Sequence, residues 1–142
     1  MSVEFEVPFV HGLQRHRMTR TGHAYDTERN MADKAMIAAL YRDACRLDPA
    51  MRPTCAPKRV PVAIEITVSR ELPQSKPRRV TSEPDVHKPD VDNVAKLVLD
   101  ALNGIAYEDD AQVGRLVVQK LPRRRLVEDH VTVTVRRPDW GD

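Results

Sequence analysis

The sequence is poor in several residue types, and each shortage excludes a class of protein. Only 4% of its 142 residues are aromatic, which is too few for the stacking platforms that bind single-stranded nucleic acid. It contains two cysteines, Cys45 and Cys55, which cannot build a disulfide framework and lack the Cys and His spacing of a zinc site. We therefore expect free thiols and a reducing, cytoplasmic location.

Long apolar runs are also missing. No window approaches the roughly 18 apolar residues needed to span a membrane, and Glu4 and Glu6 stand where a secretory signal would be basic and then apolar. The remaining composition, 41% hydrophobic and 31% charged, fits one globular domain over residues 1–142. The net charge is only +2, which as an average argues against a strongly basic nucleic-acid-binding protein.

Hydrophobic periodicity predicts an α+β domain with the order β-α-β-α-β-β. We expect one mixed or antiparallel sheet with the helices packed on one face. The last two strands are expected to form an antiparallel hairpin through a basic turn at residues 122–129. The predicted strands are residues 3–10, 60–70, 112–120 and 130–136, and the predicted helices are residues 28–47 and about 93–103.

Two further segments lack such periodicity. Residues 11–26 are polar, with Gly12 and Gly22 as breakers, and are predicted to form a loop or an irregular hairpin. Residues 73–89 hold four prolines. A segment of this length without periodicity inside a domain is usually functional or disordered.

Carboxylates concentrate between residues 88 and 113, which read KPDVDNVAKLVLDALNGIAYEDDAQV. Asp90 and Asp92 are two apart in a stretch predicted to be extended up to a helix cap at Asp92, so both side chains should point the same way. Asp109 and Asp110 meet them only if the following strand folds back along the helix. Clustered carboxylates repel unless a cation neutralises them, and oxygen ligands predict Mg²⁺, with Mn²⁺ as the alternative.

A lysine completes a plausible phosphodiesterase site. Lys96 lies four residues after Asp92 and therefore on the same helix face. A metal ion would activate a bound water and stabilise charge on the phosphorane, and Lys96 could add a fixed positive charge near the scissile phosphate. Asp100 continues this face by one turn, and we do not include it among the metal ligands.

Each of these residues also has an ordinary structural interpretation. Asp92 could simply cap the helix, Asp109 and Asp110 could form a solvated turn, and Lys96 could make a surface ion pair. An EF-hand is excluded, because Val94 occupies its third ligand position and Lys96 follows where an oxygen ligand is needed. The combination of these residues within 21 positions is the informative feature.

This combination resembles the RusA family of Holliday junction resolvases from bacteria and their phages. The resemblance is carried by Lys88-Pro89-Asp90-Val91-Asp92-Asn93, Lys96, Asp100-Ala101-Leu102-Asn103-Gly104 and Asp109-Asp110-x-Gln112-Val113. It implies a homodimeric, Mg²⁺-dependent endonuclease that resolves four-way DNA junctions in recombination and repair. By position, the catalytic residues would be Asp90, Asp92, Lys96 and Asp110. The metal ligands would be Asp90, Asp92 and Asp110, together with Asp109, the neighbour of the third aspartate. Residues 15–25 look more like the phage-type members.

The net charge of +2 hides a segregation that suits a nuclease. Residues 90–110 hold one cation, Lys96, against six carboxylates, which gives a net charge of −5. Basic loops surround this acidic segment and are predicted to hold DNA phosphates. The predicted DNA-binding residues are Arg15, Arg17, Arg20, Lys76, Arg78, Arg79 and Lys88.

Two alternatives to junction resolution stay open at this point. The chain could be a metal-dependent nuclease that acts on other branched DNA or on plain duplex. It could also be a DNA-binding module without catalysis, whose acidic cluster holds a structural cation. A four-way junction is approximately two-fold symmetric, so two equal nicks would require a C2 dimer.

Overall fold

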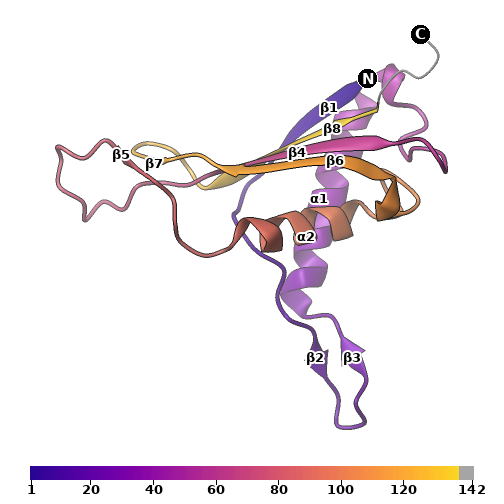
Figure 1. Cartoon of the computed structure of the whole chain (residues 1–142), viewed down its shortest axis with the longest axis horizontal. Helices are drawn as coiled ribbons and strands as arrows, with labels where there is room; N and C mark the ends of the chain where they lie inside the picture. The colour runs from indigo at the N-terminus through magenta and orange to yellow at the C-terminus, as the bar shows by residue number, and fades with distance from the viewer. Residues whose placement is uncertain (138–142) are drawn as a thin grey trace.

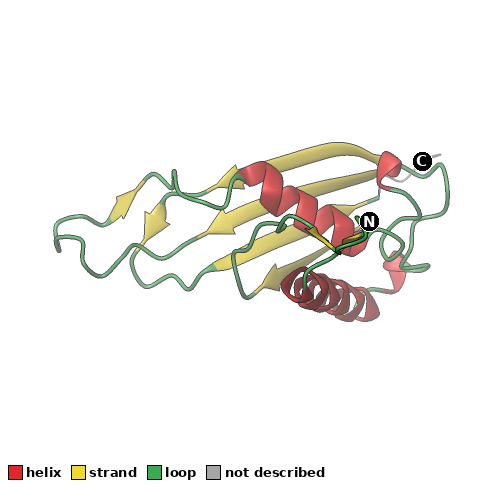
Figure 2. Ribbon diagram, turned by 90° about the horizontal axis from the view of Figure 1, so that it is seen from below, coloured by secondary structure: helices red, strands yellow, loops and turns green. Residues whose placement is uncertain are grey.

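Two helices cover one face of a four-stranded sheet in the computed structural model, which describes residues 1–137 (Figures 1 and 2). This arrangement confirms the predicted α+β class with a mixed sheet. The helices are α1 (Glu28–Arg46) and α2 (Val91–Leu102), and the strands of the sheet are β1 (Ser2–Val7), β4 (Val62–Ser69), β6 (Val113–Lys120) and β8 (His130–Arg136). Within residues 1–137, neither helix has the length and apolar character needed to cross a bilayer.

The order of the strands corrects one prediction. The sheet runs β1-β8-β4-β6, with β8 antiparallel to both of its neighbours and β4 parallel to β6. The expected hairpin between β6 and β8 is therefore wrong, because β4 lies between them. Strand β8 pairs through its backbone on both sides, and Val131, Val133 and Val135 on its inner face are at most 2% exposed. Strand β6 takes the edge, where more of its residues are exposed.

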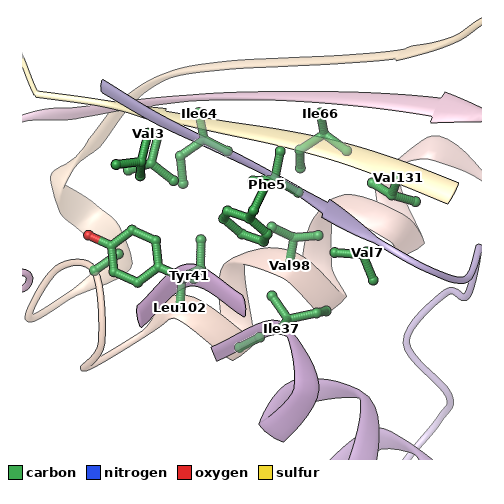
Figure 3. Packing of buried hydrophobic residues seen from close by; sticks show 14 of the residues in the cluster. Val3, Phe5, Val7, Ile37, Tyr41, Ile64, Ile66, Val98, Leu102 and Val131 are labelled. Carbon is green, nitrogen blue, oxygen red and sulfur yellow. The ribbon is translucent and has the colours of Figure 1, made fainter. Parts of the chain in front are cut away.

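Apolar side chains of the sheet and the helices form one core (Figure 3). Alternate residues of β4, such as Ile64 and Ile66, are fully buried, as period two requires. Helix α1 contributes Ile37 and Tyr41, whose ring meets Phe5 edge-on with centroids 6.2 Å apart. Helix α2 buries a stripe at helical spacing, namely Val94, Leu97, Val98, Ala101 and Leu102.

The start of α2 differs from the prediction. The helix begins at Val91 with Asp90 as its N-cap, so Asp92 is in the first turn rather than at the cap. The extended geometry that was expected to align Asp90 with Asp92 therefore does not apply. The far end agrees with the prediction, because Asn103 is the C-cap and Gly104 follows with φ of +76°, a conformation that glycine adopts without strain.

Two small ribbons extend from this body (Figure 1). Strands β2 (Arg17–Met18) and β3 (Ala24–Tyr25) form an antiparallel hairpin within the segment predicted as a loop or irregular hairpin. Strands β5 (Ser82–Glu83) and β7 (Arg123–Arg124) pair to form the second ribbon. This second pairing explains why residues 73–89 and the basic turn at 122–129 showed no strong periodicity, since each contributes only two paired residues.

Candidate active site

The N-terminal end of α2 presents two exposed carboxylates. Asp90 occupies the N-cap position, yet its side chain makes no capping hydrogen bond to the helix. Instead its Oδ2 accepts a hydrogen bond from Lys88 Nζ at 3.0 Å, in a pair whose lysine side chain is 84% exposed. Such exposed pairs contribute little to stability. Asp90 and the neighbouring Asp92 are therefore available to bind a ligand.

Two cations that were not predicted as site residues anchor the segment leading into Asp90. Arg70 Nη1 donates to the carbonyl oxygen of Lys88 at 2.5 Å, and Lys120 Nζ donates to the carbonyl oxygen of His87. Asp85, whose side chain is fully buried, lies 4.0 Å from Lys120 Nζ and accepts from the backbone N–H of His87 at 3.3 Å. Local sequence carries no signal for these contacts, because β4 and β6 bring Arg70 and Lys120 to this segment only in the folded chain.

Asp92, Lys96 and Asp100 form an exposed line along α2, which we call the α2 stripe. They are four residues apart, and all three are exposed, so they share one face as the spacing predicted. The opposite face of the helix is buried in the core. The stripe therefore extends along the helix surface from the end holding Asp90 toward the end holding Asp100.

The C-terminal end of α2 lies beside a second acidic group. Asp109 is the N-cap of the short 3-10 helix η2 (Asp110–Gln112), and its Oδ1 accepts from the backbone N–H of Ala111 at 3.1 Å. This hydrogen bond, followed by one with the carboxyl of Asp110, lowers the pKa of Asp109. Asp110 shows the opposite shift: the hydrogen bond with Asp109, partial desolvation and the nearby charges of Asp109 and Asp100 raise its pKa.

The predicted ligands thus divide between the two ends of α2. Asp90 and Asp92 lie at the start of the helix, whereas Asp109 and Asp110 lie near Asp100 in its last turn. Ten residues of helix separate Asp90 from Asp100, or about 15 Å at 1.5 Å per residue. Strand β6 does run back along α2 (Figure 1), but Asp110 precedes this strand. Within residues 1–137, no three His, Cys, Asp or Glu side chains are grouped closely enough to hold a metal ion.

The chemistry of these side chains nevertheless fits a hard divalent cation. All four are carboxylates, the oxygen ligands that Mg²⁺ and Mn²⁺ prefer. The raised pKa of Asp110 reflects negative charge that its surroundings do not neutralise, and a bound cation would relieve this repulsion. The donor types therefore suit the metal, while one copy of the described chain keeps them at two ends of a helix.

The predicted DNA-binding residues form two basic groups. Arg15, Arg17 and Arg20 are exposed on and beside the β2–β3 hairpin. In the other group, Arg78, Arg79 and Lys88 are exposed, while Lys76 pairs with Glu83 at 3.1 Å. Lys88 of the second group contacts Asp90 at the N-terminal end of α2. The segment that leads into the hairpin also touches this end, where the backbone N–H of Leu13 donates to the carbonyl oxygen of Asn93 at 3.1 Å, while the hairpin itself extends away from the helix (Figure 1).

Neighbouring arginines have structural contacts instead. Arg123 is buried and pairs with Glu83 across the β5–β7 ribbon. Arg125 donates to the carbonyl oxygens of Lys76, Pro77 and Val80 at 2.8–3.0 Å. These two side chains brace the loop that carries Arg78 and Arg79.

Comparisons with known proteins show a family to which the chain is similar over most of its length. A family model described as "Endodeoxyribonuclease RusA" matches residues 8–136. A curated relative, "Uncharacterized protein YqaN" of Bacillus subtilis (strain 168), is 41% identical over 68 residues. That alignment covers 42% of this chain and 48% of the relative, so the match spans about half the length of the curated protein.

Proposed function

Because the chain belongs to the RusA family of endodeoxyribonucleases, we propose that it resolves four-way DNA junctions by divalent-metal-dependent hydrolysis, with Mg²⁺ as the physiological ion. We also propose that the protein acts in DNA recombination and repair. Residues 8–136, nearly the whole described chain, match the family. The activity on a junction rather than on other DNA is the part that requires testing.

The observation that carries the proposal is the exposed acidic surface of α2. The α2 stripe and the flanking carboxylates of Asp90 and Asp110 are exposed, and Asp90 makes no capping hydrogen bond to the helix. Exposed acidic surface repels DNA unless cations mediate the contact. Lys88 contacts Asp90 at one end of this surface, so a DNA phosphate can be held there by charge.

We assign the roles as follows. Asp90, Asp92 and Asp110 would hold the cation, and Asp109 would act as a further ligand. When bound, the metal would supply Lewis-acid chemistry: activation of water and stabilisation of charge on the phosphate being cleaved. Lys96, in the middle of the α2 stripe, would place a fixed positive charge beside that phosphate. The β2–β3 hairpin and the loop with Arg78 and Arg79 would bind neighbouring phosphates.

We further propose that the active enzyme is a homodimer. Two symmetric nicks require two equal sites, and a C2 dimer supplies them. The division of the carboxylates between the two ends of α2 supports this proposal, because a second copy could bring Asp110 of one chain to Asp90 and Asp92 of the other. A site shared in this way would be complete only in the dimer.

A cleavage assay with three substrates tests the function. A synthetic four-way junction, a flap and a plain duplex of equal length are incubated with the protein in Mg²⁺, and the products are separated on a denaturing gel. We expect paired, symmetric nicks in the junction, and no cleavage of any substrate in EDTA. Equal cleavage of all three would show a nuclease without junction preference. No cleavage in Mg²⁺ or Mn²⁺, with a melting temperature that falls in EDTA, would favour a structural cation.

A further inference from the structure

A small pocket lies beside Asp90, and apart from Lys88 none of its charged or titratable lining residues has yet been given a function. Its volume is about 330 Å³, and it lies between the segment after β1, the first turns of α1 and the N-terminal end of α2. Its charged or titratable lining residues are His11, Arg29 and Lys88, with no carboxylate among the residues that line it. Two basic side chains, Arg29 and Lys88, thus line the pocket, and Lys88 is two positions before Asp90 in the sequence.

The wall of this pocket is held tightly against the start of α2. Gly12 approaches so closely that a Cβ there would lie 2.9 Å from the Cβ of Pro89 and 3.0 Å from the Cβ of Asn93. The hydrogen bond from Leu13 to the Asn93 carbonyl continues this contact. Any side chain at position 12 would separate the two segments. The pocket and the carboxylate of Asp90 therefore belong to one rigid unit.

A buried carboxylate contacts both His11 and Arg29. Asp33, whose side chain is 9% exposed, accepts from His11 Nδ1 at 2.9 Å and lies 3.5 Å from Arg29 Nε. The His11 ring also stacks on Phe9, with centroids 4.4 Å apart. With Nδ1 directed at Asp33, Nε2 on the other side of the ring points away from this carboxylate. The guanidinium of Arg29, held through Nε, keeps its terminal nitrogens for another partner.

We propose that this pocket binds a backbone phosphate of the DNA strand, next to the phosphate that is cleaved. The inference rests on the proposed nuclease function, and it assigns Arg29 as the phosphate ligand and Asp33 as its positioning residue. A planar guanidinium is a suitable donor to phosphate oxygens. The pocket adjoins Asp90, so a phosphate bound there would fix the register of the strand across the catalytic carboxylates.

The test combines a neutral DNA backbone with a neutral side chain. Methylphosphonate, which lacks the phosphate charge, replaces the phosphates around the mapped cleavage position one at a time, and junction binding is measured in EDTA by fluorescence anisotropy. In the wild-type protein, one such replacement adjacent to the cleaved position should weaken binding on the order of tenfold. In Arg29→Gln the same replacement should have little further effect, because the interaction is already lost.

A matched control and a conservative variant sharpen this result. Arg42→Gln removes an exposed arginine farther along α1 and should preserve the full effect of the methylphosphonate. Arg29→Lys should keep the salt dependence of binding, whereas Arg29→Gln should reduce the slope of log K against log salt by about one. An unchanged slope and an unchanged methylphosphonate effect in Arg29→Gln would overturn the pocket assignment.

Asp33→Asn separates positioning from general charge. The substitution makes the protein more positive, so electrostatics alone predicts tighter DNA binding. A positioning role predicts a smaller methylphosphonate effect at the same phosphate, and a circular dichroism melt checks that the variant folds. Undiminished coupling in a folded Asp33→Asn would show that Asp33 positions nothing. A different result would refute the nuclease proposal: the wild-type protein would bind the junction but cut no substrate with any metal.

Discussion

The two ends of helix α2 differ in their electrostatic surroundings, although both carry predicted metal ligands. At the N-terminal end, Asp90 contacts Lys88, and the segment leading into the β2–β3 hairpin contacts Asn93. At the C-terminal end, Asp110 lies among other carboxylates that raise its pKa. The first end thus pairs a carboxylate with a lysine, while at the second end two carboxyl groups share a hydrogen bond. Under the ligand assignment proposed above, both ends must act on one phosphate.

The largest expected effect comes from removing a carboxylate at the N-terminal end. Asp92→Asn should reduce junction cleavage in Mg²⁺ by about 10³-fold, because the charge that holds the cation is lost. Junction binding in EDTA should stay within a factor of a few. The control is Asp43→Asn, which neutralises an exposed carboxylate on α1 and should cleave normally. Loss of both binding and cleavage in Asp92→Asn would indicate a role in folding.

Mixing two inactive variants tests whether the two ends meet across a dimer. If each site takes Asp92 from one chain and Asp110 from the other, an Asp92→Asn/Asp110→Asn heterodimer has one site with both aspartates intact. Random association at equal concentrations should then restore about a quarter of the sites, visible as single nicks without paired resolution. Sites built within one chain would leave the mixture as inactive as either variant alone.

Lys96 lies between the two ends, and its removal should have an intermediate effect. Lys96→Gln should lower the cleavage rate by roughly a hundredfold through loss of a fixed charge near the phosphate, with a smaller effect on junction affinity. Single-turnover kinetics separate the two quantities. A substitution that changed affinity and rate in equal measure would identify Lys96 as a binding residue alone.

Asp109 and Asp110 should differ at the C-terminal end, with the smallest effect at Asp109. Asp109→Ala removes the N-cap of η2 and should lower the melting temperature by a few degrees, with cleavage reduced less than tenfold. Asp110→Asn should leave the melting temperature nearly unchanged and reduce cleavage by no more than Asp92→Asn does, but far more than Asp109→Ala does. If Asp109→Ala were instead the variant without cleavage, the assignment of the ligand within this pair would be reversed.

Much of the fold was predictable because its elements have strong local signals. The alternation in β4 and β8 and the apolar stripes of α1 and α2 identify these elements, and Asn103-Gly104 marks the end of α2. Sheet order was not predictable in this way. Whether β8 pairs with β6 or enters between β1 and β4 is decided by packing across the whole sheet, which the alternation within one strand does not encode.

The candidate site shows the same limit. The i, i+4 spacing of the α2 stripe follows from helix geometry alone and was predicted correctly. The extended approach to Asp92 was not, because α2 starts two residues earlier and takes Asp90 as its cap. The anchoring of residues 85–88 by Arg70 and Lys120, and the contact of His11 with Asp33, join residues at least 18 positions apart. No local pattern encodes such contacts.

The sequence by itself determined the residue types of this protein's chemistry: carboxylates and one lysine in a RusA-like motif, with basic segments around a net charge near zero. Helical periodicity and capping residues were enough to locate them along the chain. Only the tertiary structure decided that the carboxylates lie at two ends of one helix, and that a cationic pocket backed by Asp33 adjoins Asp90. The physical reason is that residue spacing determines which side chains share one face of a helix or strand. Long-range packing determines which faces of different elements meet.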